Sequence, residues 1–470
     1  MSNPFGGGRT SSFSNNNSNN NNNRGGGGRY NSRGGGGRNS SSQYRGGRSG
    51  NRSRGSSSNR SNHSGGRPNS SNSNNANYGE SQGARFKPCK SWTNTGKCNN
   101  PNCEFAHIVK THATVPASNQ DTSATNDNND NNNYNHHHRK VMHPVTDVAI
   151  WETQGIIKIF TASHDGFWRL WNTSGGSFVQ EFESNMRGKV ECLAVVNNFL
   201  FCGLEAPPLV NPHCPAGMCH VWNLNQPSAP PSELQLQTTH FPYAHNYAVT
   251  ALEVDVSGVV PKVFTGSSDG SIRAWSFRDN AFGLETTLPG HQRDVSGLIY
   301  MPANNLLWSS GMDGLIRIWD LSKPPLESAM HKIDGHTNAV TSLLQFNSPA
   351  GVFVLSSSLD GYLKAWNGAN GECVASENNK DGVTCMCLAQ DPKDHPVVLL
   401  GMQSGSLVCR NLVQTPQTPA FQKLFVLIHQ YTAGHTKAVR AIAPGPSSTF
   451  YSVGEDGNMM VWQLMADLQI

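Results

Sequence analysis

Three cysteines and one histidine lie close together in the first quarter of the chain. Cys89, Cys98, Cys103 and His107 are separated by eight, four and three residues. Three thiolates and one imidazole complete a tetrahedral zinc shell, which is closed to water and therefore structural rather than catalytic. Because so short a segment has no core of its own, the metal must supply the folding free energy, on the order of 10–16 kcal/mol in zinc-finger peptides. The spacing predicts a zinc finger over residues 85–110, with zinc as cofactor.

This stretch resembles the CCCH zinc-finger family. The family places an aromatic residue three positions after the first cysteine, then a glycine, and ends in Cys-x-Phe-Ala-His. Here these positions read Trp92, Gly96 and "CEFAH". The gap between Cys98 and Cys103 is four residues, where five is commoner in the family, and we expect the zinc site to tolerate this.

The resemblance implies binding of single-stranded RNA, with DNA as a second option. Carried over by position, Trp92 and Phe105 would be the rings that stack on bases. The implied phosphate contacts are Arg85, Lys87, Lys90 and Lys97. Stacking of one base on an aromatic ring contributes about 1–3 kcal/mol. The alternative is that Trp92 and Phe105 pack against the ligand loops, because the finger offers them no other core.

The segment before the finger, residues 1–84, is rich in Asn, Gly, Ser and Arg and should be a disordered arm. Residues 1–88 hold twelve Arg and one Lys against one acid, Glu80, a net charge of +12, whereas the remainder carries 23 bases and 31 acids, a net charge of −8. "RGGGGR" at 24–29 and 33–38 and "RGGR" at 45–48 resemble RGG boxes of RNA-binding proteins. We expect sequence-independent RNA contact here, the alternative being a soluble tail without a partner.

A second polar stretch follows the finger. Residues 111–137 are rich in Asn and lack periodicity, so we interpret them as a linker. His136, His137 and His138 at its end could take a metal, but a solvated linker is the better reading. No apolar run is long enough for a secretory signal or a membrane span, and the scattered cysteines suit a reducing compartment, nucleus or cytoplasm, with the nucleus favoured.

From residue 138 to 470 the sequence repeats. Five segments share an Asp-to-Trp spacing of six residues: Asp165–Trp171, Asp269–Trp275, Asp313–Trp319, Asp360–Trp366 and Asp456–Trp462. A histidine lies 21 to 24 residues before each Asp: His143, His245, His291, His336 and His435. Asp-Gly between alternating apolar segments indicates tight hairpin turns. Units of this kind cannot bury a face alone, so we expect them to close into a ring.

The gaps between the marked repeats reveal two further units. Asp165 and Asp269 are 104 residues apart and Asp360 and Asp456 are 96 apart, so each gap has room for two units. The extra units are worn, by which we mean that they lack most of the His, Asp and Trp marks. They end at Trp222 and within residues 401–412. The total is seven blades, and we expect residues 138–142 to supply the outer strand of the last.

These repeats resemble the WD-repeat β-propeller family, although only Trp319–Asp320 keeps the literal Trp-Asp pair. His, Asp and Trp can hydrogen-bond into one buried string, completed by a hydroxyl such as that of Ser310 or Ser358. The residues predicted to hold the blades in this way are His291, Asp313, Trp319, His336, Asp360 and Trp366. The predicted fold class is all-β: a seven-bladed WD-repeat propeller preceded by a CCCH finger and a disordered arm.

No residue pattern predicts catalysis. The His–Asp pairs recur at fixed offsets, whereas an enzyme needs one such site, and no nucleophile motif or phosphate loop appears. A second metal site at His213, Cys214, Cys219 and His220 competes with a Pro-rich loop, which we favour. Cys385 and Cys387 alternate on a strand and should pack in the core.

The combination of one finger with one propeller is similar to plant proteins that join these two modules. We therefore expect a non-enzymatic adaptor, in which arm and finger bind single-stranded RNA and the propeller recruits proteins. No membrane and no small-molecule substrate is expected. Asp294, Asn338 and Lys437 should lie near one rim of the ring. The alternative is a propeller receptor in a ubiquitin-ligase or chromatin complex, whose finger binds DNA or is structural.

Overall fold

The computed structural model describes residue 99 and residues 109–118, 142–173, 178–211, 214–236, 242–278, 281–324, 329–348, 351–414, 419–428 and 434–465. Every regular element within these ranges is a β-strand. The strands form seven four-stranded antiparallel sheets, and each sheet is one blade. The all-β fold class is thus confirmed.

Within each blade, the strands run in order from the innermost to the outermost. Blades 1 to 4 consist of β2 (Val145–Thr153), β3 (Ile156–Ser163), β4 (Phe167–Asn172) and β5 (Val179–Asn185); β6 (Lys189–Val196), β7 (Phe199–Asn211), β8 (Cys214–Asn223) and β9 (Ser232–Glu233); β10 (Val249–Asp255), β11 (Lys262–Ser267), β12 (Ser271–Arg278) and β13 (Ala281–Pro289); and β14 (Val295–Met301), β15 (Leu306–Gly311), β16 (Ile316–Asp320) and β17 (Ala329–Ile333). Blades 5 to 7 consist of β18 (Val340–Ser348), β19 (Gly351–Ser358), β20 (Tyr362–Asn367) and β21 (Cys373–Asn378); β22 (Val383–Gln390), β23 (Pro396–Met402), β24 (Leu407–Gln414) and β25 (Pro419–Ile428); and β26 (Val439–Pro444), β27 (Thr449–Gly454), β28 (Asn458–Leu464) and β1 (Val109–Pro116).

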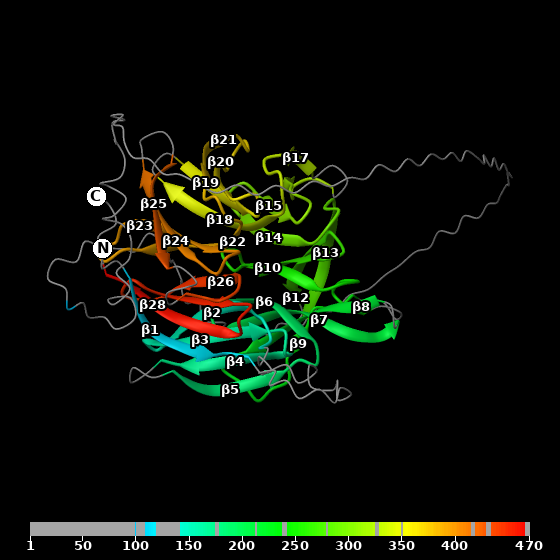
Figure 1. Ribbon diagram of the computed structural model, residues 1–470. Coiled ribbons are helices and arrows are strands. Elements are labelled where there is room, and N and C mark those ends of the chain that lie inside the picture. Colours follow the sequence, from blue (N-terminus) through cyan, green and yellow to red (C-terminus); the bar gives the residue numbers. More distant parts are fainter. Residues whose placement is uncertain are drawn as a thin grey trace, which may run out of the picture. The chain divides into compact units, whose positions relative to one another are not determined.

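The seven blades close into a ring (Figure 1). The innermost strands β2, β6, β10, β14, β18, β22 and β26 contact one another in that order, and β26 contacts β2 again. Blades 2 and 6 are the two worn units, and both lie where the gaps in the repeat placed them. The count of seven blades is confirmed.

The outer strand of blade 7 differs from the prediction. It is β1, which pairs with β28 from Val109 opposite Leu464 to Pro116 opposite Asn458. The assignment of residues 138–142 to this strand is wrong, and the boundary that began a linker at residue 111 moves with it. The reason is local: "VKTHATVP" is rich in β-branched residues, which suit a strand, but it is so short and so close to the finger and the Asn-rich stretch that the sequence divides it between them.

The second strand of a blade is buried on both faces. All six residues of β15 are buried, whereas β5, at the outer edge of blade 1, is mostly exposed. Each hydrophobic cluster joins two neighbouring blades, as when Phe264 of β11 packs in one cluster with Trp319 of β16. Burial between blades explains why the inner strands read as continuous apolar runs rather than as an alternation.

The Asp-Gly turns connect the second and third strands of their blades. Their glycines have φ angles of 88°, 77°, 80°, 85° and 79° in Gly166, Gly270, Gly314, Gly361 and Gly457. Only glycine adopts this region without strain. Beside them, the aspartate accepts a hydrogen bond from the backbone N–H two residues later, for example from Tyr362 to Asp360 at 2.9 Å. The predicted hairpin turns are confirmed.

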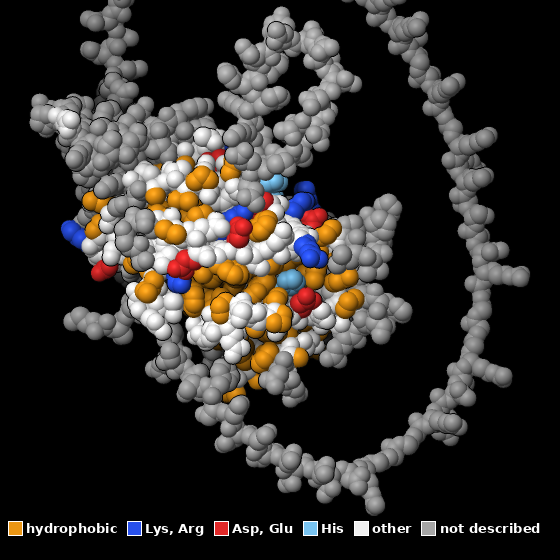
Figure 2. All heavy atoms as spheres, turned by 90° about the horizontal axis from the view of Figure 1, so that it is seen from below, with side chains coloured by type: hydrophobic (Ala, Val, Ile, Leu, Met, Phe, Trp, Pro, Cys, Tyr) orange, Lys and Arg blue, Asp and Glu red, His pale blue; other side chains and the backbone are white. Residues whose placement is uncertain are grey.

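Figure 2 shows the face that carries β5, the lowest strand in Figure 1. Hydrophobic side chains gather across it, with a few charged ones between them. On β5 itself, Val179 is 55% and Phe182 is 44% exposed, and the Phe182 ring lies 5.3 Å from that of Trp168. Within the described residues there is no helix that could cross a membrane.

Candidate functional site

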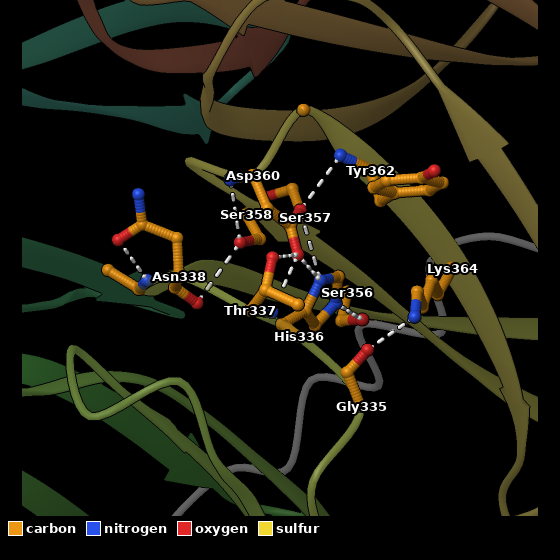
Figure 3. Close-up of polar contacts among 12 residues, drawn as sticks. Gly335, His336, Thr337, Asn338, Ser356, Ser357, Ser358, Asp360, Tyr362 and Lys364 are labelled. Atoms are coloured by element: carbon orange, nitrogen blue, oxygen red, sulfur yellow. Dashed lines mark hydrogen bonds and ion pairs between the residues drawn. The ribbon is translucent and has the colours of Figure 1, made fainter.

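Blade 5 shows how the predicted His, Asp and Trp side chains meet, and Figure 3 labels His336, Ser356 and Asp360 of this network. The Ser356 hydroxyl accepts a hydrogen bond from Trp366 Nε1 at 2.8 Å and lies 2.8 Å from His336 Nε2. The other ring nitrogen of His336 lies 3.0 Å from an Asp360 carboxylate oxygen. One chain of hydrogen bonds therefore joins the turn, the second strand and the third strand of the blade.

The same arrangement recurs in three other blades. The corresponding His, hydroxyl, Trp and Asp residues are His245, Thr265, Trp275 and Asp269; His291, Ser309, Trp319 and Asp313; and His435, Ser452, Trp462 and Asp456. In all of them the hydroxyl belongs to the second strand, ten residues before the Trp. Four copies of one buried network indicate a structural role.

The predicted hydroxyls were wrong in both examples. Ser309 and Ser356 complete the networks, whereas Ser310 and Ser358 do not. Ser310 lies one residue further along β15, where its hydroxyl is 3.0 Å from that of Ser296. Ser358 lies two residues past Ser356, beside the turn, and donates to the Asn338 carbonyl at 3.2 Å. The register of the hairpin decides which hydroxyl faces the Trp, and spacing alone did not give it.

Blade 1 departs from the pattern. His143 is two residues before the first buried valine of its blade, Val145, whereas the other four histidines are four residues before theirs. Trp171 still donates to Thr161 at 2.9 Å. The Asp165 carboxylate pairs with the buried Arg169 guanidinium at 2.7 Å. His143 and Asp165 therefore have the spacing of the other repeats, but His143 lies two residues closer to its innermost strand than the other four histidines do.

A basic residue two positions before the Trp is a recurring feature that the sequence analysis missed. Arg273 and Lys364 donate to the backbone carbonyls of Ala244 and Gly335, each directly before the network histidine. Arg169 donates to the Ala117 carbonyl at 3.1 Å, so blade 1 also holds the residue that follows β1. The signal was present in "FWRLW", "SIRAW" and "YLKAW".

Burial sets the electrostatics of the network. It lowers the pKa of His336, although Asp360 opposes this, and so favours a neutral imidazole. For Asp360, burial alone would raise the pKa, but hydrogen bonds from two backbone N–H groups and from His336 lower it overall. A neutral histidine whose two nitrogens are both engaged has no free site for proton transfer to a substrate.

Worn blade 6 replaces this network with another one. Asn379 stands where the other blades have His, and Arg410 stands where they have Trp. Arg410 is 1% exposed and its Nε donates to Asn379 Oδ1 at 2.8 Å. Its other nitrogens reach the Asn378 carbonyl at 3.3 Å and Glu377 at 3.2 Å. A buried charge is thus supplied with three acceptors.

Worn blade 2 keeps Trp222 and replaces the other network positions with apolar side chains. Cys202 and Ala216 are buried with Trp222 in one cluster, and Met186 packs against it. Cys219 is buried and burial raises the pKa of its thiol to about 12, while His220 lies 3.4 Å from Glu233. The described residues hold no group of three or more metal-binding side chains.

Several predicted residues can be placed only in part. The zinc ligands Cys89, Cys98, Cys103 and His107 lie outside the described residues, as do Trp92, Phe105, Arg85, Lys87, Lys90 and Lys97. His213 also falls outside. Cys385 and Cys387 are buried in the core as predicted. Asn338 and Lys437 are exposed, and Asp294 is half-buried beside the central cavity.

Comparison with known proteins identifies four of the blades. Residues 235–276, 282–320, 327–367 and 425–463 match the family described as "WD domain, G-beta repeat". These segments correspond to blades 3, 4, 5 and 7, the four that carry the complete network. The WD40 propeller domain of Doa1 has the same fold, with a TM-score of 0.50 and 16% identity over 76% of this chain and 97% of that domain.

Two relatives are similar over longer stretches. "Zinc finger CCCH domain-containing protein 17" of Oryza sativa subsp. japonica is 25% identical over 69% of this chain and 64% of its own length. "Cell division cycle 20.5, cofactor of APC complex" of Arabidopsis thaliana is 26% identical over 43% of this chain and 44% of its own length. The chain thus spans less than two thirds of either relative. Together with the ring described above, these matches show a seven-bladed β-propeller in which four blades match the WD-repeat family, in a chain that is similar to a rice protein named for a CCCH zinc finger.

Proposed function

We propose that this protein is a non-enzymatic adaptor that binds single-stranded RNA through its zinc finger and basic arm and recruits proteins through its propeller. The observation that carries the proposal is the donor set Cys89, Cys98, Cys103 and His107 next to a propeller built by structural networks. Three thiolates and one imidazole suit zinc, which would fold the finger and take no part in a reaction.

Chain connectivity brings the proposed RNA-binding segment close to the propeller. His107 is two residues before Val109, the first residue of β1. Two residues span at most about 7 Å, so a zinc ion held by His107 would be tethered near the edge of blade 7 by the chain itself. An RNA bound there would stay near whatever protein the propeller holds, which raises their effective concentration.

The charge distribution supports RNA as the partner of this segment. Residues 1–88 carry a net charge of +12, and the rest of the chain carries −8. A flexible cationic arm adds salt-dependent affinity without base specificity. The propeller, in contrast, offers faces of mixed polarity. WD-repeat propellers are a fold typical of protein-interaction scaffolds, and the Arabidopsis relative is by its printed name a cofactor of a complex.

The second candidate is a propeller receptor in a ubiquitin-ligase or chromatin complex, in which the finger binds DNA or is structural. The name of the Arabidopsis relative favours it. Against it, "IRIWDLSK" lacks the Arg that follows Trp-Asp in many ubiquitin-ligase substrate receptors. Either function fits residence in the nucleus, which we propose as the compartment.

Ultraviolet crosslinking in cells followed by RNA sequencing tests the proposal. We expect the wild-type protein to crosslink to RNA and the Cys98→Ser variant to lose at least about tenfold of the signal, because zinc binding is coupled to folding of the finger. The matched control is Cys373→Ser, an exposed free cysteine of the propeller, which should crosslink like wild type. Equal, weak crosslinking of all three proteins would contradict RNA binding, and zinc analysis of the purified proteins reports the metal independently.

A further inference from the structure

The outer edge of blade 1 exposes three large apolar side chains. Val179 and Phe182 of β5 are 55% and 44% exposed, and Ile156 at the start of β3 is 43% exposed. Figure 2 shows the face that carries β5, with hydrophobic side chains gathered over it. We call Ile156, Val179 and Phe182 the edge patch.

The edge patch continues the apolar cluster between blades 1 and 2 out to the surface. Ile156 lies on the same side of β3 as Phe160, four residues later, and Phe160 belongs to that cluster. Val179 and Phe182 lie opposite residues on the side of β4 that carries Trp168, another member of the cluster. The three side chains of the edge patch therefore share the face of blade 1 that turns toward blade 2.

The outer strand of blade 2 is too short to cover this face. β9 consists of Ser232 and Glu233 and pairs with two residues of β8. The outer strands of blades 3 and 5 have nine and six residues. With its neighbour truncated, β5 has six exposed residues out of seven.

The blade itself does not need an aromatic ring at the position of Phe182. Phe182 lies opposite Leu170, the residue before Trp171. The four blades with the complete network have smaller or polar residues at the equivalent position, namely Thr286, His331, Ala375 and Ala113. An exposed ring that the fold does not require indicates a contact with another molecule.

The backbone of β5 offers a second means of contact. Within the described ranges β5 pairs with β4 alone, so the N–H and C=O groups of its outer edge face solvent. Such an edge can accept an added strand from another chain. Successive side chains of an added strand point to opposite faces of the sheet, so every second one would lie against the edge patch.

Charge and area distinguish between the possible occupants. Lys158 pairs with Glu181 at 2.7 Å. Arg169 pairs with Glu183 at 3.3 Å. The cations of β3 and β4 are thus engaged and not free to bind the phosphates of a nucleic acid. At the exposed fractions given above, the edge patch offers on the order of 200–300 Å² of apolar surface, well below the roughly 800 Å² per partner of a stable dimer. The edge therefore suits one short protein segment better than a nucleic acid or a second copy of the chain.

We propose that the outer edge of blade 1 binds an extended segment of a protein partner, which adds to β5 as a fifth strand and packs large apolar side chains on the edge patch. The backbone hydrogen bonds would hold the segment, and the alternate side chains against Phe182 and Val179 would select it. This inference rests on the proposed role of the propeller in recruiting proteins, and it does not depend on RNA binding by the finger.

The test selects a display library of random dodecapeptides on the full-length protein. We expect enriched peptides to carry large apolar residues at alternate positions. A synthetic peptide of the enriched sequence should bind Phe182→Ser at least about tenfold more weakly than wild type, because the largest ring of the patch is lost. The matched control is Leu284→Ser, which removes a side chain that is 41% exposed on β13, the outer strand of blade 3, and should bind like wild type. If no selected peptide distinguishes Phe182→Ser from Leu284→Ser, the proposal fails.

Two further measurements locate the contact. Hydrogen–deuterium exchange of the complex should slow at the amides of β5 and stay unchanged at those of β13, and binding without protection of β5 would overturn strand addition. Sedimentation of the wild-type protein should show a monomer, and a dimer that Phe182→Ser abolishes would overturn the proposal in favour of self-association. RNA crosslinking of Phe182→Ser should equal that of wild type, so failure of this inference and failure of RNA binding are distinguishable.

Discussion

Blades 5 and 6 are neighbours with the same four strands, yet different polar groups hold each together. In blade 5, Ser356 is shared by His336 and Trp366, and all three are largely buried. In blade 6, Arg410 replaces the Trp and bonds to Asn379, which replaces the His. The second strand has Leu400 where blade 5 has Ser356, so no hydroxyl is left without a partner.

The comparison shows that the blade does not require one particular set of residues. In both blades, the buried donors at the network positions find acceptors, as Trp366 Nε1 and Arg410 Nε do. Blade 2 instead places apolar side chains at these positions, since Met186, Cys202 and Ala216 pack with Trp222. A blade is thus specified chiefly by strand packing, and the familiar His, Asp and Trp marks are one solution among four in this ring, since blade 1 pairs Asp165 with Arg169 instead.

The polar networks of single blades matter less to stability if the strand that completes the ring contributes more than any of them. The first prediction therefore concerns β1. Deleting residues 1–118 removes the outer strand of blade 7 and should cost on the order of 5 kcal/mol, since each lost hydrogen bond of the ladder contributes about 1 kcal/mol. Deleting residues 1–108 retains β1 and is the matched control. Urea unfolding followed by tryptophan fluorescence measures both. Identical midpoints for the two deletions would show that β1 does not close the ring.

The second prediction tests the substitute network of blade 6. Arg410→Ala leaves the Asn379 amide oxygen without its donor and opens a cavity, so we expect a loss of about 3–5 kcal/mol in unfolding free energy. Arg278, whose side chain is 68% exposed, provides the control Arg278→Ala. Thermal unfolding of both variants decides: a loss below about 1 kcal/mol for Arg410→Ala would mean that this blade is held by strand packing alone.

The third prediction tests the network of blade 5. Ser356→Ala removes the oxygen shared by His336 and Trp366, which leaves two buried ring nitrogens unsatisfied. We expect a loss of about 2–3 kcal/mol. Ser257→Ala, at an exposed loop position in blade 3, should have no measurable effect. If the two variants unfold at the same urea concentration, the shared hydroxyl contributes nothing.

The fourth prediction uses pH. Burial alone would raise the pKa of Asp456, but hydrogen bonds from His435 and two backbone N–H groups lower it overall. The stability that this carboxylate contributes is therefore present above its ordinary pKa near 4 and is lost as the pH falls below it. Asp456→Asn should cost about 1–2 kcal/mol at pH 7, and the difference from wild type should shrink at pH 3.

Blade 6 supplies the control for this experiment. Ser404 stands at the position of Asp456 and carries no titrating charge. Ser404→Ala should differ from wild type by the same small amount at pH 7 and pH 3. A difference between Asp456→Asn and wild type that stays constant over this range would show that the charge of Asp456 does not stabilise the blade.

The number of blades and the Asp-Gly turns could be predicted from the sequence because both depend on local spacing. The hydrogen-bond partners that meet across the strands of a blade could not be predicted in this way. Whether Ser309 or Ser310 faces Trp319 depends on strand register, which spacing leaves undetermined. The pairing of β1 with β28 joins residues more than 300 positions apart, and no local pattern encodes it. Arg410 was missed because a buried guanidinium at a tryptophan position resembles an exposed arginine in the sequence.

The predicted zinc site differs from the blades in that its evidence comes from the sequence alone. Its ligand types and spacing are informative in the sequence because a metal imposes fixed chemistry on four residues. The described residues begin a continuous strand only at Val109, so the site remains a prediction. The hydroxyls at the second position of five innermost strands are the opposite case. Each donates to a carbonyl of the next blade's innermost strand, and they look like ordinary strand residues until the ring brings them together; they are Thr146, Thr250, Ser296, Thr341 and Thr384.

The strand that completes blade 7 has a mechanical consequence. β1 enters its ladder at Val109, opposite Leu464, and its other end is fixed where Arg169 holds the Ala117 carbonyl. Any load applied to the chain before residue 109 is therefore borne by the edge strand of the ring. A partner that pulls on the amino-terminal part of this protein therefore applies force directly to β1, the strand that completes blade 7.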